Sequence, residues 1–199
     1  MSSRADLVRR RLQESLEVKQ ALSAEVPRIV EVADALLAAL RAGGKALFFG
    51  NGGSAADAQH LTAELVGRFA RERAPLPAVA LTVNTSSLTA IANDYRFDEV
   101  FARQILAIGS PPDVAVALST SGRSPNVVRG LQAARSRGLV TVALTGQDGG
   151  ELKENVDYCV CVPSTVTPRI QECHVLIGHI LCEILEAELG GMTPASGPR

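Results

Sequence analysis

Two residues four positions apart, His60 and Glu64, stand in the segment DAQHLTAEL. On a helix, residues at this spacing share one face, so the imidazole and the carboxylate could reach the same metal ion or the same substrate. On spacing alone, such a pair is more often an ordinary surface pair than a site. The weight given to this pair therefore depends on the other polar residues that the fold brings near it.

A second candidate helix carries Gln171 and His179, which lie two turns apart on neighbouring helix faces. The residues around His179 are almost all apolar, so a polar ring there requires a partner. The chain has three histidines, and two of them fall at these candidate positions. The third, His174, is interpreted as a structural residue or a support behind the site rather than a group that does chemistry.

Two polar loops follow apolar runs of strand length, at Gly50–Ser54 (GNGGS) and Ser119–Ser124 (STSGRS). The carboxyl ends of parallel strands are where open α/β sheets bind ligands. Four hydroxyls in the second loop, with the N–H groups of a helix beginning near Pro125, could surround a phosphate with donors. An ordinary Ser/Gly turn that caps a helix is the alternative. No P-loop lysine follows, which disfavours a nucleoside triphosphate.

The pattern of apolar residues predicts the strands and helices that position these residues. Short apolar runs without polar alternation predict strands of a parallel sheet covered on both faces. These runs are Lys45–Phe49, Ala78–Leu81, Val114–Leu118, Val140–Leu144 and Tyr158–Val162. Helical stretches alternate with them, at Ala55–Phe69, Phe101–Ile108, Asn126–Arg137 and Pro168–Leu189. The alternation is typical of right-handed βαβ crossovers in a doubly wound α/β fold.

Two amphipathic helices are expected to open the chain, across residues 4–42. Apolar residues recur there at four-residue spacing on both sides of Pro27, and Gly43 ends the second helix. A length of 199 residues suits one domain. We therefore predict a single α/β domain over residues 1–199, in which only the Gly- and Pro-containing tail, residues 190–199, is loosely ordered.

The charge balance argues against a nucleic-acid partner, because 20 Lys and Arg residues face 21 Asp and Glu residues. No stretch approaches the roughly 20 apolar residues of a membrane span, and the charged N-terminus lacks the apolar core of a signal peptide. We expect a cytoplasmic protein with a small-molecule partner, and neither a nucleic-acid nor a membrane partner.

The four cysteines do not have the paired spacing of a zinc ribbon or of a secreted disulfide framework. They fall late in the chain, inside apolar stretches, at Cys159, Cys161, Cys173 and Cys182. We interpret them as small core residues.

Several motifs together resemble those of a known family. They are GNGGSAADAQHLTAEL, LTAIANDYRFDEVFARQ, STSGRSPN, ALTGQDGGEL and RIQECHVLIGH, and with the opening helices they span nearly the whole chain to Leu189. Ser-Thr-Ser-Gly, combined with a His-x3-Glu helix and Gln-x7-His, resembles the sugar isomerase (SIS) domain and, within it, the phosphoheptose isomerases. The resemblance implies an α/β fold with a five-stranded parallel sheet flanked by helices. It also implies a homotetramer whose active sites are made by more than one subunit.

The resemblance further implies a site with zinc, one ion per subunit. The metal ligands would be His60, Glu64, Gln171 and His179, and the catalytic residues Glu64 and His179. The substrate would contact Asn51, Gly52, Gly53, Glu64, Asn93, Asp94 and Gln171, with its phosphate on Ser119, Thr120, Ser121 and Ser124. Glutamine is an uncommon zinc ligand, and a metal ion bound to the catalytic base would compete with proton abstraction. The sequence is therefore compatible with either a catalytic or a regulatory role for the ion.

The implied reaction converts sedoheptulose 7-phosphate to D-glycero-D-manno-heptose 7-phosphate, the first step of heptose biosynthesis. Moving a proton between C1 and C2 through an enediol requires a base beside the carbons and an acid beside the oxygens. We expect Glu64 as the base and His179 as the acid, which also helps to open the sugar ring. The Ser loop would orient the far end of the substrate.

Two other functions occur on the same fold. A close branch of the family resembles a non-catalytic adaptor that binds the bacterial replication initiator, and that branch lacks the catalytic Glu and the final His. Both Glu64 and His179 are present here. A regulatory sugar-phosphate sensor usually carries a DNA-binding domain as well, for which this chain has no room. We therefore expect an aldose–ketose isomerase, with the adaptor as the alternative.

Overall fold

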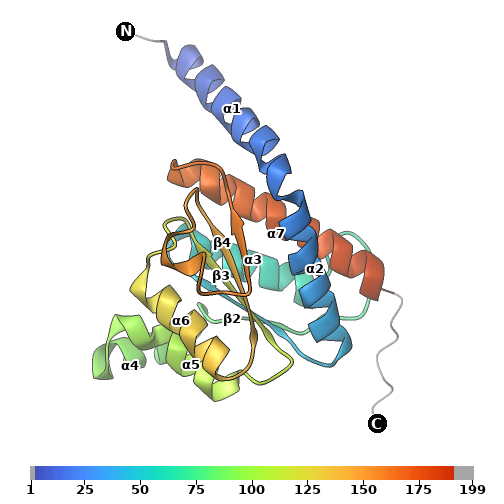
Figure 1. The fold of residues 1–199 in the computed structure, drawn as a ribbon, viewed down its shortest axis with the longest axis vertical. Helices are drawn as coiled ribbons and strands as arrows, with labels where there is room; N and C mark the ends of the chain where they lie inside the picture. The colour runs from blue at the N-terminus through green and yellow to red at the C-terminus, as the bar shows by residue number, and fades with distance from the viewer. Residues whose placement is uncertain (1–2, 191–199) are drawn as a thin grey trace.

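The computed structural model describes residues 3–190 and contains a five-stranded parallel sheet with helices on both faces (Figure 1). The strand order is β2-β1-β3-β4-β5. The strands are β1 (Ala46–Gly50), β2 (Ala78–Ala80), β3 (Val114–Ser119), β4 (Val140–Thr145) and β5 (Tyr158–Cys161). Every residue of β3 is buried, which explains why its sequence is a continuous apolar run. The predicted doubly wound α/β class is confirmed.

The helices form two layers, one on each face of the sheet. They are α1 (Arg4–Ala21), α2 (Val26–Arg41), α3 (Gly53–Val66), α4 (Thr85–Asp94), α5 (Val100–Ile108), α6 (Pro125–Ser136) and α7 (Thr167–Leu189), with short 3-10 turns η1 (Leu22–Glu25), η2 (Phe97–Glu99) and η3 (Gly150–Leu152). Helices α2, α3 and α7 share one apolar cluster with the sheet, and α5 and α6 share the other. Phe48 enters the first cluster and Phe49 the second, because successive strand residues point to opposite faces.

The predicted strands and helices all occur, with ends that differ by a few residues. Helix α4 was not predicted, and it has no buried residue. Its sequence, TSSLTAIAND, has only two large apolar residues, Leu88 and Ile91, which pack partly buried against the second cluster, and so short a stripe does not predict a helix. The Asn84 side chain starts this helix by accepting a hydrogen bond from the Ser87 N–H at 2.9 Å.

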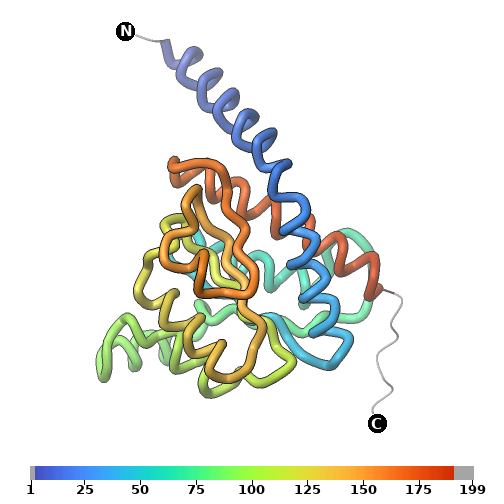
Figure 2. Tube along the Cα trace, viewed as in Figure 1, coloured from blue at the N-terminus to red at the C-terminus, as the bar shows by residue number. Residues whose placement is uncertain are grey.

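The two opening helices form one continuous helical segment, in which η1 joins α1 to α2 (Figure 1). Helix α1 extends away from the rest of the chain, as the tube in Figure 2 shows, and none of its residues is buried. Its apolar residues Leu12 and Leu16 are 67% and 50% exposed, so residues 3–190 leave this stripe largely uncovered. None of the helices in the described part combines the length and hydropathy that a membrane span requires. The predicted loose tail, apart from Gly190, lies outside the described residues.

Candidate active site

Helices α3 and α7 pack unusually closely, and a glycine makes this contact possible. A Cβ atom on Gly178 would lie 2.3 Å from Cδ2 of Leu61, which is well inside van der Waals contact. Leu61 is almost fully buried, so a side chain at position 178 would force it to shift within the core. His60 directly precedes Leu61 on α3, and His179 directly follows Gly178 on α7. The contact between Leu61 and Gly178 therefore brings the two histidine rings together.

His60, Glu64 and His179 form one cluster of possible metal ligands. The Nε2 atoms of His60 and His179 are 2.8 Å apart, and Glu64 Oε1 lies 3.6 Å from His60 Nε2. One ligand atom from each of the three residues lies within 4.8 Å of the others. The side chains of His60 and Glu64 are 46% and 22% exposed, so a substrate can reach both.

The donors in this cluster fit a divalent metal ion. Two imidazole nitrogens and a carboxylate are a common set of protein ligands for zinc. At 2.8 Å the two ring nitrogens share one hydrogen, and in the tautomers that ligate metal both nitrogens would instead offer a lone pair to the ion. The Asp57 carboxyl lies one helical turn before His60 and interacts with its charge, while burial raises the pKa of Asp57. A carboxylate near a ligating histidine commonly orients the ring.

Gln171, near the start of α7, lies against the first turn of α3. A Cβ atom on Gly53 would be 2.5 Å from Gln171 Nε2, so only glycine allows the amide to approach this closely. Gly52, just before it, has a φ of +56° and occupies the N-cap position of α3. The structure thus joins Gln171 to the Gly50–Ser54 loop. Its role as a metal ligand stays a prediction.

Asn51 is held by a residue to which the sequence analysis gave no role. The side-chain amides of Asn51 and Asn126 exchange two hydrogen bonds, each of 2.8 Å. Asn126 is buried at the start of α6, so this pair ties the first polar loop to the helix that follows the second. In the sequence, the one sign that Asn126 is buried and has a partner is that a polar residue stands between apolar neighbours in the first turn of a helix.

The Ser119–Ser124 loop folds back on itself at the end of β3. Ser119 Oγ accepts a hydrogen bond from the Gly122 N–H at 3.2 Å and lies 3.5 Å from Ser124 Oγ. Gly122 has a φ of +61°, and a Cβ atom there would be 2.1 Å from the Gly149 carbonyl oxygen. The Ser124 hydroxyl precedes α6 without capping it. This hydroxyl is therefore available to a ligand at the positive end of the helix.

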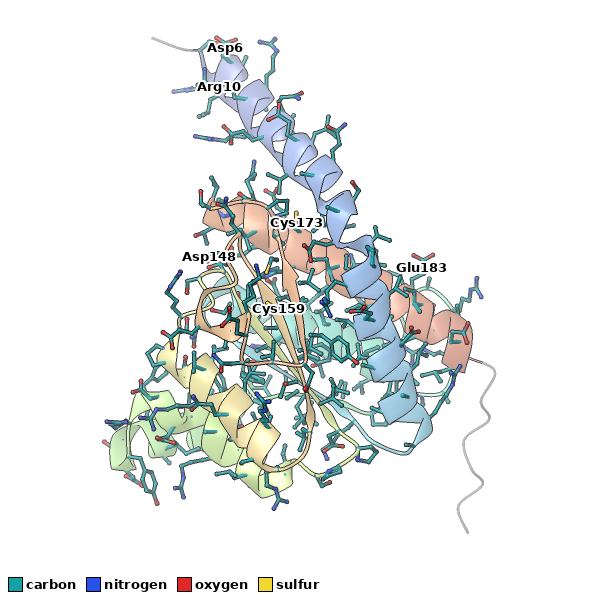
Figure 3. All side chains as sticks on the ribbon, viewed as in Figure 1. Asp6, Arg10, Asp148, Cys159, Cys173 and Glu183 are labelled. Atoms are coloured by element: carbon teal, nitrogen blue, oxygen red, sulfur yellow. The ribbon has the colours of Figure 1, made fainter. Side chains whose placement is uncertain are left out.

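A cavity of about 490 Å³ opens beside this loop. Its walls are Thr120, Ser121, Arg123, Gln147, Asp148, Ser164, Thr165, Thr167 and Ile170. An Arg123–Asp148 ion pair of 2.5 Å crosses its rim, where Figure 3 labels Asp148. The volume suits a small phosphorylated sugar. The lining residues do not include His60, Glu64 or His179, so the cavity and the histidine cluster are separate features of the single chain.

Asn93 and Asp94 lie at the exposed end of α4, where the Asn93 amide donates to Asp94 Oδ1 at 2.9 Å. Helix α4 packs against η2 and α5, and Figure 1 places it well apart from α7. Within one chain, the structure therefore brings His60, Glu64 and His179 together and leaves Asn93 and Asp94 away from them.

Two charged residues that the sequence analysis did not single out fix the turn that carries Glu64. Arg73 donates to the Glu64 carbonyl oxygen at 2.8 Å and pairs with Glu186 at 3.3 Å. Both side chains are almost completely buried. Glu186 also accepts the backbone N–H groups of three residues, Phe69, Ala70 and Arg71. This network joins the end of α3 to α7 through charge-assisted hydrogen bonds.

His174 is fully buried beneath the cluster, and its Nε2 atom bonds the Thr145 carbonyl oxygen at 3.2 Å. Burial lowers the pKa of His174 to about 4. The ring is therefore neutral near pH 7, which agrees with its interpretation as a supporting residue.

The buried His174 predicts a specific loss of stability in acid. The unfolded chain binds a proton near pH 6.5, whereas the folded chain does so only near pH 4. Stability from this group therefore falls as the pH decreases through that window, by about 2 kcal/mol at pH 5. Urea unfolding should show a steeper loss between pH 7 and pH 5 for the wild type than for His174→Gln, which keeps a donor but does not titrate. Equal slopes would contradict this origin.

The chain matches known proteins over most of its length. Residues 12–146 match the family described as SIS domain. A phosphoheptose isomerase from Rhodospirillum rubrum is 58% identical over 163 residues, which cover 82% of this chain and 87% of that protein. One from Aquifex aeolicus is 53% identical over 180 residues, covering 90% and 94% of the two chains.

Solved structures show the same relationship. A phosphoheptose isomerase from Neisseria gonorrhoeae has a TM-score of 0.88 and 43% identity, covering 93% of this chain and 100% of that chain. One from Francisella tularensis has a TM-score of 0.90 and 36% identity, covering 94% and 100%. The family match, the identity over most of both chains and the shared fold lead to one conclusion: the chain belongs to the SIS domain family and, within it, to the phosphoheptose isomerases.

Proposed function

We propose that this enzyme converts sedoheptulose 7-phosphate to D-glycero-D-manno-heptose 7-phosphate in the cytoplasm. The observation that carries the proposal is the cluster of His60, Glu64 and His179, in which a possible base, a possible acid and a third ligand lie within 4.8 Å. The comparisons give no support to the alternative of a replication-initiator adaptor, and the relatives described above are named as isomerases.

The cluster supplies the two kinds of proton transfer that the reaction needs. With the sugar open, the Glu64 carboxylate removes a proton from C1 and returns it to C2, and the electrons pass through a 1,2-enediol. His179 moves a proton between O1 and O2 and assists ring opening. The close contact of Leu61 with Gly178 holds the two helices in place, so base and acid are oriented before the substrate binds.

The proposed metal site consists of His60, Glu64, Gln171 and His179, with one zinc ion per subunit. When bound, the ion would supply positive charge for the oxygens of the enediolate. The two rings and the carboxylate already face one another. Gln171 also contacts Gly53, so it would link this site to the first polar loop.

We further propose a homotetramer in which neighbouring subunits complete each site. The apolar stripe of α1 is largely uncovered by the part of the chain that the structure describes, and burying it against a second copy would be favourable. The end of α4 is also exposed, with Tyr95 and Phe97 at 55% and 59%. Asn93 and Asp94 would reach the substrate of a neighbouring subunit from this position.

Removing two hydroxyls from the Ser loop should weaken substrate binding strongly. In the double variant Ser121→Ala/Ser124→Ala, the phosphate loses two hydrogen bonds to a charged group, each worth about 1.5–3 kcal/mol. We expect KM to rise by about 100-fold or more with a smaller change in kcat. Steady-state kinetics with sedoheptulose 7-phosphate measures this effect.

The matched control for this prediction is Ser136→Ala at the other end of α6, where the hydroxyl contacts only the Ala133 carbonyl oxygen among the described groups. It should leave KM unchanged. Unphosphorylated sedoheptulose should be a very poor substrate of the wild type and equally poor for the double variant. If the wild type converts the phosphorylated and the unphosphorylated sugar equally well, the Ser loop does not bind the phosphate as proposed.

A further inference from the structure

Two thiols lie side by side on the edge strand β5. Cys159 and Cys161 flank the buried Val160, so both side chains leave the same face of the strand. Their sulfur atoms are 3.7 Å apart. The interpretation of all four cysteines as small core residues fits the buried Cys173 and Cys182, and it holds only in part for this pair, which is partly buried with Cys159 packed against the second apolar cluster.

Small solutes can reach the pair from the surface. Both cysteines line an open cavity of about 300 Å³ at the edge of the sheet, together with Ala24, Glu25, Pro27, Arg28, Glu31 and Lys153. Strand β5 has a neighbouring strand on one side only. Figure 3 labels Cys159 on this strand. The position combines access with two thiols close enough to react with one another.

The surroundings favour one ionised thiol. The two sulfurs can share one hydrogen, so the thiols titrate as a pair in which the pKa of one thiol, assigned to Cys161, is lowered and that of the other, Cys159, is raised. The Thr145 hydroxyl, 3.5 Å from the Cys161 sulfur, and the charge of Lys153 act in the same direction on Cys161, against burial and the carboxylate of Glu25. A thiolate is the form that attacks peroxides.

We propose that Cys159 and Cys161 form a peroxide-reactive dithiol that closes reversibly to an intrachain disulfide. The Cys161 thiolate attacks a hydroperoxide, the O–O bond breaks, and a sulfenic acid and an alcohol, or water, are formed. The Cys159 sulfur then displaces the hydroxyl, which leaves as water, and the S–S bond forms. Two thiols are oxidised by two electrons and one hydroperoxide is reduced.

The bond can close only if the strand bends locally, because same-face side chains leave a flat strand in parallel, whereas a disulfide needs Cβ atoms about 4 Å apart. Residues two positions apart on a strand have Cα atoms about 6.6 Å apart, near the upper end of the range of about 4.4–6.8 Å that a disulfide spans. The sulfurs must approach from 3.7 Å to about 2 Å. A strand with one free edge can bend to permit this. The strained bond is expected to be reduced readily by dithiothreitol.

Formation of the disulfide should also change the conformation of the Ser119–Ser124 loop. A Cβ atom on Gly149 would lie 3.2 Å from the Cys161 sulfur, so the thiol lies against this turn. The Gly149 carbonyl in turn packs against Gly122, whose own carbonyl accepts the Glu151 N–H at 3.0 Å. A shift of Cys161 is therefore transmitted to the loop proposed to hold phosphate. This step rests on the proposed function, whereas formation of the disulfide does not.

The disulfide is tested by treating the protein with hydrogen peroxide, alkylating it under denaturing conditions and analysing its peptides by mass spectrometry. We expect the peptide with Cys159 and Cys161 to be two hydrogens lighter and unalkylated, and dithiothreitol to restore alkylation of both. Cys159→Ser should instead hold a sulfenic acid on Cys161 that dimedone traps. Cys182→Ser, a change at a buried thiol, should leave the disulfide unaffected. Full alkylation of both thiols after peroxide treatment would overturn the proposal.

The effect on the Ser loop is measured as KM for sedoheptulose 7-phosphate before and after oxidation. We expect a rise of about tenfold in the wild type, reversed by dithiothreitol, and no change in peroxide-treated Cys159→Ser. A disulfide that forms without changing KM overturns the transmission through Gly149. A reduced protein without isomerase activity contradicts the proposed function instead, and the mass measurement still decides whether the disulfide forms.

Discussion

Glu64→Gln should lower the turnover of sedoheptulose 7-phosphate by about a thousandfold while KM changes little. The amide keeps the size of the side chain but cannot accept a proton from C1. The backbone of Glu64 is held by Arg73 through its carbonyl oxygen, a contact that the substitution leaves in place. Initial rates of aldose formation, measured with a thermal melt of each protein, provide the test.

Glu154→Gln is the matched control for this variant, because Glu154 is an exposed carboxylate in the turn between η3 and β5, on neither of the helices that form the cluster. It removes one negative charge without touching the cluster, so its turnover should equal that of the wild type. If Glu64→Gln turns over at a near-normal rate with a normal melting temperature, Glu64 is not the base.

His179→Ala should remove bound zinc and lower turnover by about a thousandfold, because the ring is both a proposed ligand and the proposed acid. Removing one of the four proposed ligands should weaken zinc binding by at least about 100-fold. Elemental analysis of purified protein gives the metal content, and light scattering gives the assembly. The wild type should contain about one zinc ion per subunit and be a tetramer.

His60→Ala separates the two roles of His179, since it removes a ligand and the 2.8 Å contact but leaves the acid in place. We expect it to lose zinc as His179→Ala does, and to keep more turnover than His179→Ala when zinc is supplied in excess. A His179→Ala protein that keeps its zinc and its full turnover would contradict both the ligand set and the acid. A wild type that is metal-free, monomeric and fully active would contradict the proposed zinc site and the tetramer.

The sheet and most helices could be predicted because their pattern is local. Buried parallel strands are continuous apolar runs, and the helices between them carry apolar stripes, so each element is visible in its own residues. Helix α4 carries only a short apolar stripe, Leu88 and Ile91, which is partly buried. The other signal is the cap at Asn84, and such a cap also occurs in turns.

The candidate site was predictable only in part, for a different reason. The spacing of His60 and Glu64 follows from one helix, whereas their meeting with His179 depends on the fit of Gly178 against Leu61, two residues far apart in the chain. The Asn51–Asn126 pair and the Arg73–Glu186 pair also join distant segments. Nothing in the local pattern of a polar residue reveals its partner, so these supports became visible only in three dimensions.

The same limit explains the cysteines. Cys159 and Cys161 stand in an apolar run that reads as a buried strand, and the run is correctly a strand. Its position at the edge of the sheet follows from the order in which the strands pair, which a strand's own residues do not encode. The pair is therefore only partly buried, at the margin of the second apolar cluster.

The most direct test of the central claim follows sedoheptulose 7-phosphate by NMR during incubation with the purified protein in D2O. We predict conversion to D-glycero-D-manno-heptose 7-phosphate, with deuterium appearing at C2 of the aldose because the proton that Glu64 carries exchanges with solvent. The Glu64→Gln protein should leave the ketose unchanged over the same period. A wild-type protein that leaves the ketose unchanged, or that forms an aldose free of deuterium after prolonged equilibration, would contradict isomerisation through an enediol.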